Sequence, residues 1–106
     1  MAAMNINAKQ YEELILGSKP VMVDFWAPWC GYCRRIDPVL NKLADSREDV
    51  MIVKVNIDEE PALAQKEQIE VIPTLVLYRK GEAIGSIVAP ESKAAIEAFI
   101  QESLAK

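Results

Sequence analysis

Short runs of hydrophobic residues divide the chain and predict where its strands lie. The runs at 21–26 and 50–57 are almost continuous, which is typical of strands that are buried in a sheet. Two further runs, 74–78 and 83–88, flank the dipeptide Lys80-Gly81. Because such a dipeptide favours a tight turn, these two runs are predicted to form a β-hairpin.

Between these runs, hydrophobic residues recur three and four positions apart, as they do on one face of a helix. The first predicted helix begins at Asn7, whose side chain is placed to cap it, and ends at Gly17. The second begins near Cys30. A short third helix covers roughly 60–67, and the last helix runs from Glu91 onward.

These elements predict the fold class α/β. A short extra strand is expected near Asn5, and after the first helix the order of elements is β-α-β-α-β-β-α. Strands that alternate with helices pair in parallel, whereas the hairpin adds antiparallel strands, so we expect a central mixed sheet with helices on both faces. A chain of 106 residues is long enough to bury such a core, and we expect residues 1–106 to form one domain.

Composition narrows the range of partners and compartments. The chain has 12 basic and 16 acidic residues, a net charge of −4, and therefore no basic face for nucleic acid. No hydrophobic run approaches the ~18 residues of a membrane span. The start, Met1-Ala2-Ala3-Met4-Asn5, lacks the basic and apolar regions of a signal peptide. We therefore expect a cytoplasmic monomer, although a mature form whose signal peptide had been removed would start in the same way.

The only two cysteines, Cys30 and Cys33, are the strongest candidates for chemistry. A disulfide between them would close a loop of about four residues and stabilise the fold by roughly 1.9 kcal/mol, against about 3 for fifteen residues. Such a pair is better explained by its reactivity, as a redox dithiol. A thiolate is stabilised at a helix N-terminus. Cys30 is therefore the expected nucleophile, and Cys33 is expected to resolve the mixed disulfide.

A metal site or a structural role would be the alternative to a redox dithiol. A zinc site needs four ligands, and the chain offers two thiols and no histidine, so carboxylates would have to complete it. The cysteines would otherwise be inert core residues, or would share a metal or cluster with a second chain. We expect no metal.

Two charged residues interrupt the predicted buried strands. Asp24 lies within 21–26, and Lys54 lies within 50–57. A buried carboxylate is costly unless it is paired or protonated, and burial raises its pKa toward the range that is useful for proton transfer. If the two strands are neighbours, Asp24 and Lys54 are expected to form a partly buried pair beneath the cysteines. A purely structural ion pair is the alternative.

Several motifs, in the usual order and spread over the whole chain, closely resemble the thioredoxin family. They are Val23-Asp24-Phe25-Trp26-Ala27-Pro28-Trp29-Cys30-Gly31-Tyr32-Cys33-Arg34 with Pro38 after it, Lys54-Val55-Asn56-Ile57-Asp58, Ile72-Pro73-Thr74, and Tyr78-Arg79-Lys80-Gly81. The resemblance implies the thioredoxin fold and a thiol–disulfide oxidoreductase that reduces disulfides in proteins. It also implies that no cofactor is bound and that electrons come from a partner reductase, which draws on NADPH or another donor.

The resemblance also implies roles for individual residues. Asp24, assisted by Lys54, would take the proton from Cys33 through water. Ile72-Pro73 would be a cis peptide bond that faces the sulfurs and positions an extended substrate. The remaining expected substrate contacts are Trp29, Gly31, Tyr32 and Val88.

Two positions depart from the family pattern. Typical members carry Cys-Gly-Pro-Cys, whereas this chain has Tyr32 in place of that proline. Tyr32 restores an N–H near Cys30, so we expect a less reducing couple. Cys-Gly-Tyr-Cys is similar to the active site of bacterial periplasmic disulfide isomerases. The second departure is Val88-Ala89-Pro90, where the family usually has a glycine. Two alternatives therefore stay open: an oxidase or isomerase in an oxidising compartment, and a non-catalytic binding subunit.

Overall fold

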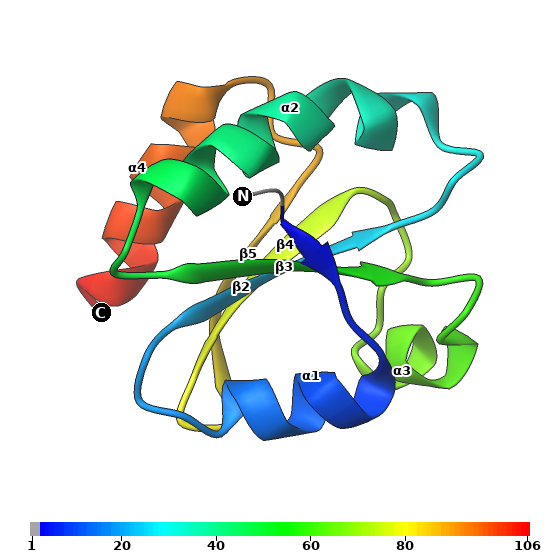
Figure 1. Ribbon diagram of the computed structural model, residues 1–106, viewed down its shortest axis with the longest axis horizontal. Helices are drawn as coiled ribbons and strands as arrows, with labels where there is room; N and C mark the ends of the chain where they lie inside the picture. The colour runs from blue at the N-terminus through cyan, green and yellow to red at the C-terminus, as the bar shows by residue number, and fades with distance from the viewer. Residues whose placement is uncertain (1–2) are drawn as a thin grey trace.

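The computed structural model describes residues 3–106 as a central sheet with helices on both faces (Figure 1). Residues 1 and 2, the start of the segment in which we expect no signal peptide, lie outside the described residues. The strands are β1 (Met4–Asn5), β2 (Val21–Trp26), β3 (Met51–Asn56), β4 (Thr74–Arg79) and β5 (Glu82–Val88). The helices are α1 (Ala8–Ile15), α2 (Gly31–Ser46), α3 (Pro61–Lys66) and α4 (Lys93–Leu104).

The described residues form a five-stranded mixed sheet in the order β1-β3-β2-β4-β5. Strands β1 and β2 both pair with β3 in parallel, whereas β4 is antiparallel to β2 and to β5. The predicted α/β class and the short strand near Asn5 are confirmed. In this order β2 is the central strand, and Asp24 lies between Lys54 of β3 and Leu75 of β4.

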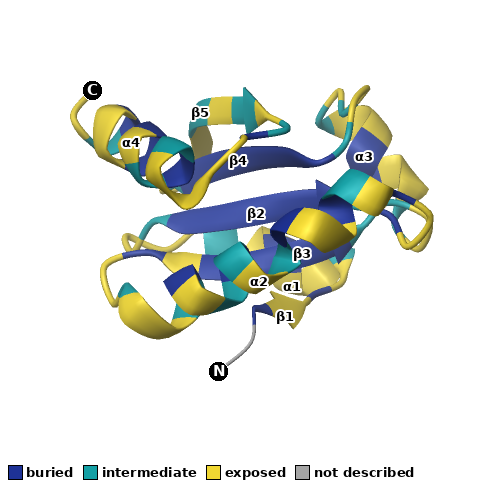
Figure 2. Ribbon diagram, turned by 90° about the horizontal axis from the view of Figure 1, so that it is seen from above, coloured by how far each residue is buried: buried dark blue, intermediate teal, exposed yellow. Residues whose placement is uncertain are grey.

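Each face of the sheet is covered by two helices and has its own hydrophobic core. Helices α2 and α4 cover one face, and α1 and α3 cover the other (Figure 1). Because side chains alternate along a strand, Met22 packs in the core under α2 and α4, while Val23 packs in the core under α1 and α3. Strands β2 and β4 are almost completely buried, and the helices expose their outer sides (Figure 2).

Helix boundaries follow the capping residues. Asn7 caps α1 with the full capping box, as predicted: its side chain accepts from the N–H of Gln10, whose side chain accepts from the N–H of Asn7. Helix α4 begins at Lys93 rather than at Glu91. The reason is that Ser92 has an extended backbone and accepts a hydrogen bond from the N–H of Ala95, which makes Ser92 the N-cap.

The hairpin between β4 and β5 turns at Lys80-Gly81, as predicted. Both residues have a positive φ, 55° for Lys80 and 83° for Gly81, which is the conformation of a two-residue type I′ turn. The turn is also fixed from outside, because the N–H of Gly81 donates to the carbonyl of Ile15 and that of Lys80 to the carbonyl of Gly17. The hairpin is thereby attached to the end of α1.

Gly85 of β5 lets the edge strand approach α4 closely. A Cβ at this position would lie 2.2 Å from Ser103 Oγ and 3.1 Å from Phe99 Cε1. We expect Gly85→Ala to lower the free energy of unfolding by about 1–3 kcal/mol, the usual cost of overpacking a core. Urea denaturation followed by tryptophan fluorescence measures this loss.

Gly17→Ala is the matched control for that substitution. A Cβ at Gly17 would meet its nearest neighbour, the carbonyl oxygen of Leu14, at 3.5 Å, which is ordinary van der Waals contact. Equal stability of the Gly85 and Gly17 variants would show that the contact between β5 and α4 does not require a glycine.

Candidate functional site

The two cysteines lie where central strand β2 leads into α2. Cys30 is the N-cap residue of α2, and its sulfur accepts a hydrogen bond from the N–H of Cys33 at 3.1 Å. The pair forms a disulfide with a Cα–Cα distance of 5.3 Å. Cys30 is 9% exposed and Cys33 only 2%. Cys30 is therefore the more exposed of the two cysteines, in line with its place at the start of the helix.

The Ile72-Pro73 segment stands directly beside the Cys30 sulfur. Its peptide bond is cis, as the family resemblance implies, and the carbonyl oxygen of Ile72 lies 3.9 Å from Cys30 Sγ. The carbonyl of Pro73 accepts a hydrogen bond from the N–H of Ala89 at 2.8 Å. Val88 pairs with Thr74 across the hairpin, so the end of β5 lies next to the cis-proline segment. Pro73 and Val88, two expected contact residues, are thus brought together.

Exposed hydrophobic side chains lie next to Cys30, next to the cis-proline segment and at the end of β5. They are Trp29, Val71 and Val88. Trp29 is two-thirds exposed, as the family resemblance implies, and its indole Nε1–H donates to the carboxylate of Asp58 at 3.1 Å. Asp58 was not predicted to have a role, because nothing in its local pattern indicates which ring it meets. Gly31, the first residue of α2, has open space where a Cβ would lie.

Asp24 is a buried carboxyl group without a hydrogen bond. It is 1% exposed, and neither carboxylate oxygen accepts a hydrogen bond. Side-chain alternation places it on the same face of β2 as Met22, which is the face covered by α2. Burial raises the pKa of Asp24 to about 7, against the smaller lowering effect of the Lys54 charge, and the charge of Asp37 raises it further.

Our expectation that Asp24 pairs directly with Lys54 is wrong. The two residues are neighbours in register, but Lys54 Nζ forms its ion pair with Asp37 of α2, at 2.5 Å, and also stacks over the Trp26 ring at 4.5 Å. The Asp37 side chain is 35% exposed, so its negative charge is partly solvated, whereas the carboxyl group of Asp24 is buried. The ammonium group therefore binds the carboxylate that is in partial contact with solvent.

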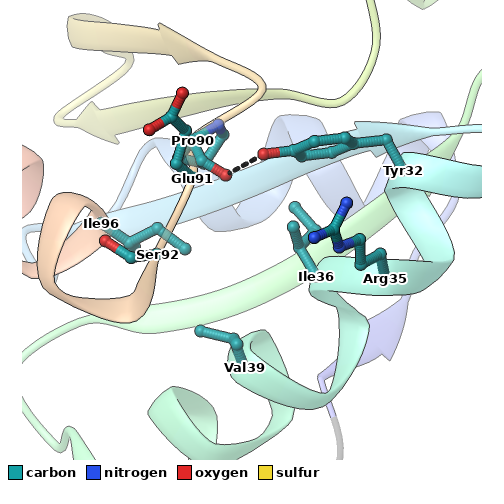
Figure 3. Close-up of a pocket in the computed structure, with 8 residues that line it drawn as sticks. All are labelled: Tyr32, Arg35, Ile36, Val39, Pro90, Glu91, Ser92 and Ile96. Carbon is teal, nitrogen blue, oxygen red and sulfur yellow. Dashed lines mark hydrogen bonds between the residues drawn. The ribbon is translucent and has the colours of Figure 1, made fainter.

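Tyr32 points toward the segment that follows β5. Its hydroxyl donates to the carbonyl of Pro90 at 2.9 Å and lies 3.4 Å from that of Ala89. The ring forms part of the wall of a cavity of about 520 Å³ between α2 and the start of α4 (Figure 3). From the sequence we expected Tyr32 to supply a backbone N–H near Cys30. The N–H that bonds the sulfur is that of Cys33.

Metal-binding clusters and membrane-spanning helices are both missing from the described part of the chain. Within residues 3–106, no cluster of three or more histidine, cysteine, aspartate or glutamate side chains is arranged to hold a metal ion. Over the same residues, no helix is long and apolar enough to span a membrane.

Comparison with known proteins gives the same family throughout. The family model described as Thioredoxin matches residues 2–102. A thioredoxin from Alicyclobacillus acidocaldarius is 38% identical over 97% of this chain and 99% of its own length. The bifunctional thioredoxin reductase/thioredoxin of Mycobacterium leprae is 36% identical over 85% of this chain and 20% of its own length.

A solved structure agrees with these sequence matches. The crystal structure of Malassezia sympodialis thioredoxin superposes with a TM-score of 0.87 at 33% identity, covering 96% of this chain and 91% of that one. With Cys30 and Cys33 joined at the start of α2, beside a cis-proline, the site has the arrangement that the sequence motifs predicted. The chain belongs to the thioredoxin family, and it is a thiol–disulfide oxidoreductase.

Proposed function

We propose that the protein reduces disulfide bonds in other proteins through attack by Cys30 and resolution by Cys33. The observation that carries this proposal is the position of Cys30, which is the more exposed cysteine, the N-cap of α2 and the neighbour of the Ile72 carbonyl. The helix N-terminus and the N–H of Cys33 both stabilise negative charge on Cys30 Sγ. A thiolate is therefore favoured at this sulfur when the pair is reduced.

The reaction transfers two electrons from the dithiol to the substrate. The Cys30 thiolate attacks one sulfur of the substrate disulfide, which forms a Cys30–substrate bond and releases the other substrate sulfur as a thiolate. The Cys33 thiol then loses its proton and attacks Cys30 Sγ. This step forms the Cys30–Cys33 disulfide and releases the second substrate thiolate, so the substrate is reduced and the protein is oxidised.

We propose that Asp24 accepts the proton that the Cys33 thiol loses. Cys33 lies in the first turn of α2, and Asp24 points to the face of the sheet that α2 covers. A carboxyl group with a pKa of about 7 accepts and returns a proton at neutral pH, whereas an ordinary aspartate would stay ionised. Lys54 acts on this group through its charge, and a water molecule would carry the proton between the two side chains.

The substrate is proposed to bind across the three segments that surround Cys30. An extended chain would lie against the backbone of Ile72-Pro73, with the exposed apolar side chains of Trp29 and Val88 as contacts at its sides. Gly31 and Tyr32 complete the surface on the α2 side. Because main-chain groups recognise any extended peptide, this arrangement suits many protein substrates.

The electron donor is proposed to be a thioredoxin-reductase-like protein. The relative from Mycobacterium leprae combines, by its name, a thioredoxin reductase and a thioredoxin in one chain, which supports such a partner here. We propose that residues 1–106 work as one redox domain, monomeric and cytoplasmic, without a bound cofactor, in electron transport to protein disulfides. Nucleic acid and membranes are not among its proposed partners.

Cysteine substitutions test the division of labour. Cys30→Ser is expected to abolish the acceleration of insulin reduction by dithiothreitol, measured as turbidity, because the attacking thiolate is gone. Cys33→Ser keeps that thiolate but cannot resolve the intermediate, so a covalent adduct with insulin should accumulate on a non-reducing gel. A wild-type protein no faster than dithiothreitol alone, with no adduct in Cys33→Ser, would instead favour a non-catalytic binding subunit.

Replacement of Asp24 by asparagine is expected to change both kinetics and stability. Resolution of the mixed disulfide should slow by about a hundredfold at pH 8, the low end of what a positioned base contributes. The folded pKa is raised, so the folded protein holds a proton that the unfolded chain has lost between about pH 4 and pH 7. Wild-type stability therefore falls as the pH rises through this window, by roughly 4 kcal/mol.

An asparagine at position 24 cannot ionise, so the Asp24→Asn variant should be more stable than wild type at pH 8 and similar to it at pH 4. Urea denaturation of the oxidised proteins at the two pH values measures this difference. A difference of the same size at both pH values would rule out ionisation of Asp24 as its cause. An unchanged rate of resolution at pH 8 would remove Asp24 from the proton transfer.

Asp37→Asn tests how the neighbouring ion pair acts on Asp24. The substitution removes a negative charge that raises the pKa of Asp24 and releases Lys54 from its present partner. Both effects lower the pKa of Asp24, so the pH profile of resolution should move to lower pH. Carboxyl chemical shifts of Asp24, followed by NMR as a function of pH, measure the pKa directly.

Asp49→Asn is the matched control for the Asp37 substitution. It removes an identical charge that pairs with Arg47 at 2.7 Å, and Asp49 is not among the groups that act on the pKa of Asp24. The Asp49 variant should leave the Asp24 titration in place. Equal titration curves for all three proteins would show that Asp37 does not influence Asp24.

A further inference from the structure

The two positions that depart from the family pattern contact each other. Tyr32 replaces the usual proline between the cysteines, and Ala89-Pro90 replaces the usual glycine after β5. The Tyr32 hydroxyl donates to the carbonyl of Pro90 at 2.9 Å and lies 3.4 Å from that of Ala89 (Figure 3). One side chain thus joins the active-site turn to a segment 57 and 58 residues away in sequence.

This segment has few hydrogen bonds of its own. Strand β5 ends at Val88 and α4 begins at Lys93, and Pro90 has no N–H to donate. Ala89 has a φ of 44°, in the left-handed region that costs a non-glycine residue about 1 kcal/mol or more. Among the described residues, the segment's hydrogen bonds come from two sides: the Ala89 N–H donates to the carbonyl of Pro73, and the Tyr32 hydroxyl donates to the carbonyl of Pro90.

These contacts connect the segment to both sides of the substrate surface. The Pro73 carbonyl belongs to the cis-proline segment, whose Ile72 carbonyl lies 3.9 Å from Cys30 Sγ. Tyr32 belongs to the first turn of α2, between the two cysteines. Ala89 and Pro90, which follow Val88 of β5, are therefore held between the cis-proline segment and the active-site turn.

We propose that Tyr32 is a positioning residue for protein substrates, because its hydroxyl holds the Ala89-Pro90 segment in place beside the cis-proline segment. This inference rests on the proposed reduction of protein disulfides. It separates substrate recognition from the properties of the redox couple. The hydroxyl acts on substrate recognition, whereas the donor to Cys30 Sγ is the backbone N–H of Cys33, which the hydroxyl does not touch.

Tyr32→Phe isolates the hydroxyl. The ring packs at the edge of the core under α2 and α4, so phenylalanine keeps that packing and loses only the hydrogen bond. A neutral hydrogen bond has a net worth of about 0.5–1.5 kcal/mol, which corresponds to roughly two- to tenfold in an equilibrium constant. We expect the ratio of kcat/KM for insulin to kcat/KM for 5,5′-dithiobis(2-nitrobenzoic acid) to fall by this factor, mainly through a higher KM for insulin.

Two further measurements distinguish positioning from a general structural effect. The amide hydrogen of Ala89 should exchange faster in Tyr32→Phe, because the segment that holds it against Pro73 has lost its second contact. The reduction potential of the Cys30–Cys33 couple should stay at its wild-type value. Tyr32→Pro, which also alters the backbone between the cysteines, should change the potential and the substrate ratio together.

Tyr78→Phe is the matched control, since it removes a tyrosine hydroxyl that donates to Glu67 in another part of the molecule. It should lower stability and leave the ratio between the two substrates unchanged. An unchanged ratio in Tyr32→Phe, or an equal loss with both substrates, would overturn the inference. If wild type itself did not reduce insulin, the proposed function would fail. Exchange of the Ala89 amide would still show whether Tyr32 holds the segment.

Discussion

The structure of the site depends on one hydrogen bond, in which the sulfur of Cys30 caps α2. N-cap positions are usually occupied by serine, threonine, aspartate or asparagine, whose oxygen accepts an N–H of the first turn. Here a sulfur accepts the N–H of Cys33. The same contact caps the helix, fixes the position of the Cys30 sulfur and, once the pair is reduced, would stabilise negative charge on that sulfur. Helix geometry and thiol chemistry therefore cannot be varied independently at this position.

Two carboxyl groups, those of Asp24 and Asp37, lie near the single ammonium group of Lys54, and only Asp37 forms an ion pair with it. Lys54 lies in register beside Asp24, yet its ammonium group binds Asp37, where the negative charge is partly solvated. Asp24 is left with no hydrogen bond and a pKa of about 7, raised chiefly by burial. Because a buried, unpaired carboxylate is energetically costly, Asp24 gains and loses its proton near neutral pH.

The sequence predicted those features that depend on local pattern or on motif spacing. The buried strands, the Lys80-Gly81 turn and the helix that begins at Cys30 follow from hydrophobic periodicity and capping residues. The cis bond before Pro73 came from the family resemblance alone. The contacts of Asp37 and of the Tyr32 hydroxyl were missed. Each joins elements far apart in the chain, and neither residue type indicates locally which partner it will reach.

The contact between Tyr32 and the Ala89-Pro90 segment gives a physical reason to treat the two family departures as one change. A proline at position 32 would have no hydroxyl to bind the Pro90 carbonyl, and that segment would keep the Ala89 N–H bond to Pro73 as its remaining contact. A glycine at position 89 would adopt the left-handed backbone without strain and would need less support. The tyrosine therefore supplies, through tertiary contact, the stability that a glycine at position 89 would supply through its own conformation.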